Sequence, residues 1–321
     1  MYRRGVYTGG GGVAIGRRIG NASGMARDQT QTLSHVAPDL DTFLRASAGG
    51  LGDGPVALIF AEDGIELAST LQHHLDKGFR TVVMLGPAGL QLPEALAARI
   101  HRVRFQPGGR EAVADAVTRI AARLPGTWIY WGYNAEYLIY PHAETRTVGE
   151  MLAFHAEERR EGMMTYVVDL YAADLGAAPN GVSLDACCLD KAGYYMLDRY
   201  DGDGARLDRQ YDIFGGLRWR FEEHVAEDAR RIDRIGLFRA KPGLTLRPDF
   251  TFSDSEYNTV SCAWHHNLTA AICSFRAAKA LKANPGSTHL IPSFRWQHSV
   301  PFEWSSQQLL ELGFIEPGQW F

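Results

Sequence analysis

Short continuous apolar runs alternate with amphipathic segments in the first half of the chain. Such runs are typical of strands that are buried on both faces of a sheet. They cover residues 56–60, 81–85 and 128–131, and a further strand is expected at Val103-Arg104-Phe105. Apolar residues at helical spacing separate them, within 65–75, 92–100 and 113–124. Strands that alternate with helices across short turns predict a mostly parallel α/β sheet that is flanked by helices on both faces.

The second half of the sequence is less regular. A helix is expected at 148–155 and a strand at 163–170, and residues 172–217 are rich in Gly, Asp and Tyr, which predicts a loop-rich insertion. A second helical stripe follows a histidine pair, with apolar positions at Leu268, Ile272, Phe275 and Ala278. We therefore expect one α/β domain over residues 31–321 with a loop-rich C-terminal elaboration. A flexible Gly- and Arg-rich tail is expected at residues 1–30.

Composition excludes several classes of protein. The 321 residues are 45% hydrophobic and carry a net charge of -4, which excludes a strongly basic nucleic-acid binder. No apolar run reaches the ~18 residues that a membrane-spanning helix needs. The four cysteines include no C-x-x-C pair, so we expect reduced, buried thiols and a cytoplasmic location. The sequence leaves the oligomeric state open.

Two nucleotide-binding motifs are absent. Gly11 and Gly16 have the spacing of a P-loop, but Arg17 and Arg18 stand where lysine and a hydroxyl residue are required. No apolar strand precedes those glycines. After the first strand the chain reads Glu-Asp-Gly at 62–64, which lacks the glycine fingerprint of a dinucleotide-binding oxidoreductase. Neither class fits.

The segment 131–142 directly follows the fourth strand and reads Trp-Gly-Tyr-Asn-Ala-Glu-Tyr-Leu-Ile-Tyr-Pro-His. It resembles the metal-binding segment of bacterial glycosyltransferase family 2 proteins, which reads roughly Asp-Ala-Asp-Glu-Phe-Leu-Val-Tyr-Pro-His. Further short elements of that family are matched in the same order, at 144–146, 168–171, 215–218, 234–239 and 264–266. The resemblance covers about residues 55–285, and the order of the elements is more specific than any one of them.

The resemblance implies a GT-A fold, which is Rossmann-like, and the transfer of a sugar from a nucleotide-sugar donor. The acceptor would be a hydroxyl group of a carbohydrate or of a lipid-linked precursor. Transfer would be a single inverting displacement. The nucleotide-binding half would span about 55–141, and the acceptor half would span about 142–321.

The chain departs from the family at the Asp-x-Asp motif. Two carboxylates in that motif hold Mg²⁺ or Mn²⁺, which neutralises the leaving diphosphate. Here Tyr133 and Ala135 occupy the matching positions. Glu136 remains as an acid, with Asn134 beside it as a neutral oxygen ligand. After the second strand, 86–89 read Gly-Pro-Ala-Gly and carry no acid.

Two replacements for the missing metal site are open. Glu136 with His265 or His266 could bind Mn²⁺ or Zn²⁺, since carboxylate and imidazole are acceptable ligands. Alternatively, Arg218 and Arg220 could neutralise the diphosphate without a metal, because guanidinium pairs bidentately with phosphate. Adjacent histidines do not share a helix face, so a structural role for the pair is an equal alternative.

The candidate site follows from these matches. Glu62, Asp63, Asn134, Arg218 and Arg220 are the candidates for donor binding.

Two acids are the candidates for catalysis. Asp169 ends an apolar strand and is the candidate base that deprotonates the acceptor, and Glu136 is the second catalytic candidate. For each of them a structural role stays open, as a surface acid for Glu136 and as a salt-bridged or capping residue for Asp169. Arg218 and Arg220 have the alternating spacing of a strand, which would put both on one face. They would then either bind phosphate together or lie on a solvent-exposed edge. His73 and His74 lie within the first helix and are expected to be structural.

A rival function comes from the same departures. The chain could be a non-catalytic sugar- or partner-binding protein that kept the scaffold and lost the metal site. Nucleotide binding and its dependence on a divalent metal distinguish the two.

Overall fold

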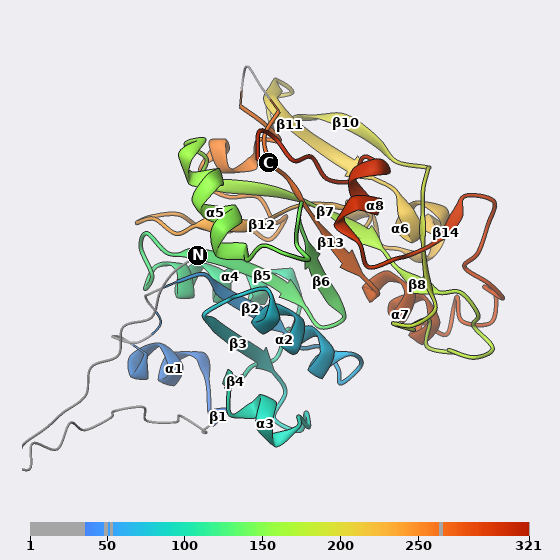
Figure 1. Cartoon of the computed structure of the whole chain (residues 1–321), viewed down its shortest axis with the longest axis horizontal. Helices are drawn as coiled ribbons and strands as arrows, with labels where there is room; N and C mark the ends of the chain where they lie inside the picture. The colour runs from blue at the N-terminus through green and yellow to red at the C-terminus, as the bar shows by residue number, and fades with distance from the viewer. Residues whose placement is uncertain (1–35, 48–50, 52–53, 263–265, 321) are drawn as a thin grey trace, which may run out of the picture. The chain divides into compact units, whose positions relative to one another are not determined.

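The protein is built around a large mixed sheet (Figure 1). The structure is a computed structural model that describes residues 36–47, 51, 54–262 and 266–320. The chain divides after Thr32, and all described residues belong to the second unit, Leu33–Phe321. The tail expected at residues 1–30 and the candidate ligand His265 lie outside the described residues.

Nine strands of the described residues form this sheet, in the order β1-β4-β3-β2-β5-β12-β7-β13-β6. Their bounds in that order are Val36–Ala37, His101–Arg104, Thr81–Gly86, Val56–Phe60, Trp128–Tyr133, Asp233–Arg239, Gly162–Asp169, Ala270–Ser274 and Glu136–Ile139. β12 runs antiparallel to β5 and β7, and β6 runs antiparallel to β13. The remaining pairs are parallel. The expected mostly parallel α/β sheet is confirmed.

Helices cover both faces of the sheet, as the alternation of elements predicts. On one face, α1 (Leu40–Ala46) and α4 (Arg110–Ala121) pack on Val56, Leu58 and Phe60 of β2. The opposite face of β2, with Ala57 and Ile59, belongs to the cluster that includes α2, α3 and α5. These helices span Leu67–Asp76, Glu94–Ala97 and Val148–Glu157. Both faces of the central strands are therefore sealed from water.

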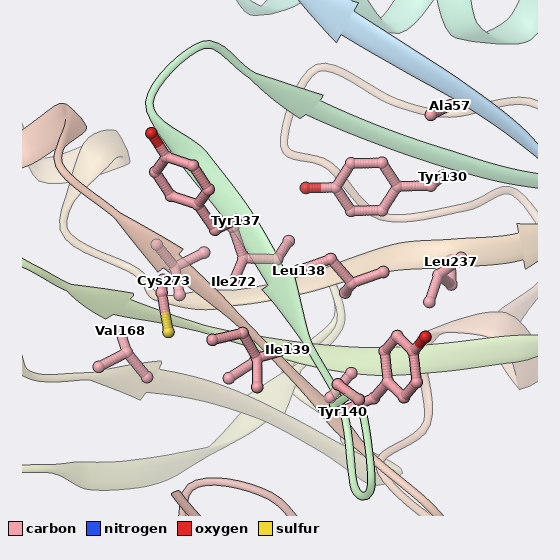
Figure 2. Packing of buried hydrophobic residues seen from close by; sticks show 14 of the residues in the cluster. Ala57, Tyr130, Tyr137, Leu138, Ile139, Tyr140, Val168, Leu237, Ile272 and Cys273 are labelled. Carbon is pink, nitrogen blue, oxygen red and sulfur yellow. The ribbon is translucent and has the colours of Figure 1, made fainter. Parts of the chain in front are cut away.

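The core on the second face continues across the strands of the C-terminal half. Figure 2 shows side chains of β6, β13 and β7 that belong to the same buried cluster as Tyr130 of β5. They include Leu138, Ile272 and Val168, all fully or almost fully buried. His73 and His74 of α2 lie beside this core, and burial lowers their pKa values to about 4 and about 3. Their expected structural role fits these positions, because neutral imidazoles pack here against Tyr137 and Tyr130.

The C-terminal elaboration carries two small sheets and further helices. The hairpin β10–β11 joins Tyr195–Tyr200 to Arg206–Phe214, and the second sheet pairs β8, β9 and β14. The strands of that second sheet are Tyr171–Ala172, Cys187–Asp190 and Ser299–Pro301. The helices are α6, α7 and α8, at Gly216–Arg220, Arg276–Ala283 and Ser306–Glu311, with short 3-10 turns at Glu222–His224, Glu227–Ala229 and Ser255–Asn258.

Two expectations about local structure are wrong, for the stripe at 268–278 and for Arg218 and Arg220. The stripe from Leu268 to Ala278 is not one helix, because Ala270–Ser274 form β13 between β7 and β6, and α7 begins only at Arg276. A buried strand and a buried helix segment cannot be distinguished by an apolar run alone. Arg218 and Arg220 lie on the helix α6 rather than on a strand. Residues 172–217 contain β9, β10 and β11, and the irregular stretches around these strands fit the expected loop-rich insertion.

The strand directions bring polar residues to one edge of the sheet. The parallel strands β2, β5, β7 and β13 end there, and the antiparallel strands β12 and β6 begin there. We call this the carboxyl edge. Ligands of open α/β sheets bind at this edge. The polar strand residues at this edge include Tyr133, Glu136, Asp169, Asp233 and Ser274.

Candidate functional site

The turn between β5 and β6 places Glu136 in the interior at the carboxyl edge. Ala135 has a positive φ of 60°, and its backbone N–H donates to Thr70 Oγ1 at 2.8 Å. Glu136 Oε2 accepts hydrogen bonds from the backbone N–H of Tyr133 at 2.9 Å and from Arg234 Nη2 at 2.6 Å. Its Oε1 accepts from Ser274 Oγ at 3.1 Å. The side chain is fully buried, so Glu136 is not a surface acid.

The charge of Glu136 is held by arginine. Burial alone disfavours the charged form, but Arg234 and Arg276 outweigh it and hold the pKa of Glu136 below its ordinary value. A carboxylate with a low pKa beside a buried guanidinium is ionised at neutral pH. Glu136 and Arg234 therefore form a buried ion pair that joins the β5–β6 turn to β12.

These residues do not fit a divalent cation. Mg²⁺ and Mn²⁺ need several oxygen ligands that point at one position. The first Asp-x-Asp position carries the ring of Tyr133, and both carboxylate oxygens of Glu136 already accept hydrogen bonds. Among the described residues no group of three or more His, Cys, Asp and Glu side chains could hold a metal ion.

The structure does not bring His266 to Glu136. Glu136 pairs with Ser274 at the end of β13, whereas His266 precedes the start of that strand. His266 is exposed and its Nδ1 lies 3.3 Å from Glu316. A five-residue strand separates the two positions by roughly 13 Å along its axis. A guanidinium, from Arg234, occupies the place beside Glu136.

Three of the donor-binding candidates, Glu62 and Asp63 of the β2–α2 loop and Asn134 of the β5–β6 turn, are linked by hydrogen bonds. Asn134 is fully buried, and its Oδ1 accepts from the backbone N–H of Glu62 at 2.9 Å. Its amide donates to Asp63 at 2.7 Å. Helix α7 then supplies one cation for each acid: Arg276 pairs with Glu62, and Lys279 pairs with Asp63 at 2.9 Å. This network fixes α7 against the β2–α2 loop.

Arginines from distant segments converge on a cavity of about 110 Å³ at the carboxyl edge. We call it the arginine cavity, and its arginines are Arg110, Arg218, Arg231, Arg234 and Arg276. Tyr133 lies in its wall, with the Arg276 guanidinium 3.5 Å from its ring centroid. Asp233 is the acid of the lining. Each of these arginines is paired with an acid, and together they surround a small space with N–H donors, which suits an anion with several oxygens.

Two buried donors of the arginine cavity, the Nε groups of Arg231 and Arg234, have no hydrogen-bond partner among the described residues. Arg234 is 5% exposed, and its Nε is a buried polar atom without a hydrogen-bond partner among the described residues. A buried N–H without an acceptor is costly, and native structures usually satisfy it. The carboxylate of Glu136 satisfies Nη2 on the same guanidinium. The remaining N–H suits an oxygen of a bound anion or of water.

Asp169 lies at the end of β7 under Arg218. Its side chain is fully buried, and it accepts from Arg218 Nε at 3.1 Å and from the backbone N–H of Arg218 at 3.3 Å. Burial raises the pKa of Asp169 although Arg218 opposes the shift. Gly216 makes this approach possible: it has φ of +64°, and a Cβ there would lie 2.9 Å from Asp169 Oδ2. The Gly-Gly-x-Arg element is therefore the cradle of this carboxylate.

Arg220 belongs to another cluster. Its Nε lies 2.8 Å from Asp190 Oδ2, and its Nη2 donates to the carbonyl of Phe294 at 2.5 Å. Asp190 also accepts from Tyr171 and from Trp296 Nε1. Arg218 lines the arginine cavity and Arg220 does not. Of the expected arginine pair, only Arg218 reaches the carboxyl-edge site.

A larger cavity of about 320 Å³ adjoins the arginine cavity. Arg218, Arg276 and Ala229 line both. The rest of its lining mixes polar groups, including Glu62 and His224, with small apolar side chains of α7 and of the 225–229 segment. A ligand with an anionic part and a bulkier uncharged part could therefore occupy the two spaces together.

Four arginines of the site were not predicted from the sequence: Arg110, Arg231, Arg234 and Arg276. Arg234 opens one of the matched family elements, at 234–239, and that position was its signal. Arg276 follows β13, which was expected to be helix. Arg110 and Arg231 carry no local signal, because they meet the site only through the tertiary fold.

No protein-family model matches the sequence, and a search of curated proteins finds no match. No helix in the described part of the chain has both the length and the apolarity to span a membrane.

Proposed function

We propose that the protein transfers a sugar from a nucleotide-sugar donor to a hydroxyl acceptor, on a GT-A-type scaffold in which arginines replace the metal ion. The observation that carries the proposal is the arginine cavity at the carboxyl edge. It lies where the family resemblance puts the donor diphosphate. A diphosphate has several oxygens and two negative charges, and guanidinium groups bind such oxygens bidentately.

The chemistry needs a base and a stabilised leaving group. Asp169 accepts the proton of the acceptor hydroxyl, whose oxygen forms a bond to C1 of the donor sugar. The bond from C1 to the phosphate oxygen breaks, and the nucleoside diphosphate leaves with the electron pair. Arg218, Arg234 and Arg276 stabilise the developing charge, which preorganised cations do most effectively in a site shielded from water. Glu136 acts through Arg234, as a positioning residue.

The first prediction concerns metal. Calorimetric titration with UDP, GDP, dTDP and ADP, in EDTA and in Mn²⁺, is expected to show binding of at least one nucleotide with dissociation constants that agree within about twofold between the two conditions. Guanidinium groups need no metal bridge to bind phosphate. Binding that requires Mn²⁺ would contradict the arginine site. No binding of the four nucleotides at millimolar concentration would contradict the transferase proposal.

A second candidate function is a non-catalytic binding protein. The observation in its favour is that Asp169 is fully buried and covered by Arg218. Incubation with the matching nucleotide-sugar, followed by assay of released nucleoside diphosphate with a panel of sugar acceptors, separates the two. Donor binding without release in any acceptor mixture favours the binding protein.

A further inference from the structure

The pair of Arg218 and Asp169 lies where three cavities meet. Arg218 lines the arginine cavity, the neighbouring 320 Å³ cavity and a third cavity beside the β10–β11 hairpin. Its side chain is 12% exposed, whereas that of Asp169 is completely buried. A ligand in these cavities therefore meets Arg218, and Arg218 shields Asp169 from it.

Asp169 depends on Arg218 for its charge. Among the described residues, the groups that face it are Arg218 from α6, Asp190 from β9 and Tyr194 from the loop after β9. Asp190 is an acid that is occupied with Arg220, and the Tyr194 hydroxyl is neutral at physiological pH because burial raises its pKa well above the ordinary value. Arg218 is therefore the cation in direct contact with Asp169.

Arg218 cannot serve both partners fully. Its Nε and its backbone N–H are directed at Asp169, and its Nη1 donates to the carbonyl of Arg231 at 3.3 Å. A diphosphate in the arginine cavity carries two charges against the single charge of Asp169. A bidentate contact with phosphate uses two N–H groups on one edge of the guanidinium. One edge includes Nε, which donates to Asp169, and the other includes Nη1, which donates to the Arg231 carbonyl, so a diphosphate competes with these partners for Arg218.

We propose that Arg218 is shared between Asp169 and the donor diphosphate, so that donor binding draws the Arg218 guanidinium away and uncovers Asp169 for the acceptor. Arg218 is then a positioning residue that permits the base to act only when the donor is in place. This inference rests on the proposed function, because the diphosphate is the anion that competes for Arg218. It explains how a fully buried carboxylate can meet a substrate.

Donor binding is expected to change the protonation of Asp169, which can be measured without any acceptor. When Arg218 turns away, the buried Asp169 loses its counter-charge, and its proton affinity rises. A group that binds protons more strongly in the complex makes ligand binding take up protons from the buffer as the pH is lowered. The Asp169 carboxylate is thus expected to gain protons upon donor binding at pH values between its pKa in the free protein and its higher pKa in the complex.

The test is calorimetric titration with UDP-glucose, GDP-mannose, dTDP-glucose and ADP-glucose, in buffers of different ionisation enthalpy at several pH values. Both phosphates of these donors are esterified, which avoids the proton of a terminal phosphate with a pKa of about 6. The dependence of the observed heat on buffer enthalpy gives the protons taken up. We expect uptake that passes through a maximum as the pH is lowered, at up to a large fraction of one proton per ligand.

Two variants and a matched control make the test specific. Asp169→Asn keeps the shape but cannot titrate, so uptake is lost, and the donor binds about tenfold more tightly because no carboxylate holds Arg218 back. Arg218→Gln removes the cation before the donor arrives, so uptake is lost and binding weakens. Asp212→Asn removes one of the two acids that pair with Arg231, another arginine of the cavity, and leaves the uptake unchanged.

The outcomes distinguish this inference from the proposed function. Donor binding with no proton uptake in the native protein overturns the sharing of Arg218 and leaves the transferase proposal intact. Uptake that persists in Asp169→Asn overturns it as well, since another group would then be titrating. Absence of binding of all four donors at millimolar concentration overturns the proposed function and this inference with it.

Discussion

Replacing Arg234 by methionine is expected to lower the free energy of unfolding by about 3–5 kcal/mol, because the change leaves the Glu136 carboxylate buried without its cation. Glu136 is fully buried, and Arg234 supplies both its shortest hydrogen bond and its opposite charge. The guanidinium also stacks near Trp131, with 4.8 Å to the ring centroid. Urea unfolding followed by circular dichroism gives the free energy directly.

Two further variants isolate the buried charge as the cause. The double variant Glu136→Gln with Arg234→Met removes both charges, so it is expected to be more stable than Arg234→Met alone. Arg239→Met changes an exposed arginine at the other end of the same strand and is expected to cost under about 1 kcal/mol. A loss below about 1 kcal/mol in Arg234→Met would show that Glu136 is neutral or solvated, and the description of the site would be wrong.

The fold could be predicted from the sequence where a short apolar run between turn residues is compatible only with a buried strand. The runs at 56–60, 81–85 and 128–131 are short, apolar and bounded by turn residues, and all three are strands of the central sheet. The run at 270–274 is equally apolar but has a helical spacing of larger residues around it. Its pairing with β7 and β6, rather than its own pattern, makes it a strand. Local periodicity does not contain that information.

The candidate site was predicted in part, for a related reason. Glu136 and Asp169 follow apolar strands directly, so their position at the carboxyl edge is visible in the sequence. The positions of the cavity arginines other than Arg218 could not be predicted from the sequence in this way. Arg234 reaches that edge because β12 runs antiparallel, which puts the beginning of this strand beside the ends of β5 and β7. The residues near Arg234 do not by themselves indicate that β12 runs antiparallel to its neighbours.

Helix α7 offers the sharpest contrast for testing the arginine cavity. Arg276 and Lys279 are both cations of its first turn, and each pairs with an acid of the β2–α2 loop, Glu62 and Asp63 respectively. Arg276 lines both cavities and lies over Tyr133, whereas Lys279 is 7% exposed and lines neither. The two residues therefore share helix, charge and type of partner, and differ in whether they reach the proposed ligand.

Replacing Arg276 by methionine is expected to weaken binding of the nucleoside diphosphate by about 10- to 100-fold, which is what the loss of a charge-assisted contact of about 1.5–3 kcal/mol produces. Lys279→Met is expected to change binding by less than about twofold, although it breaks an ion pair of the same kind. Calorimetric titration measures binding for both variants. Repeated at high salt, it is expected to show that added salt weakens nucleotide binding by the native protein more than nucleotide binding by Arg276→Met, because screening acts on the charge that the variant lacks. Equal losses in the two variants would mean that α7 acts only by bracing the loop, and that the arginine cavity is not where the diphosphate binds.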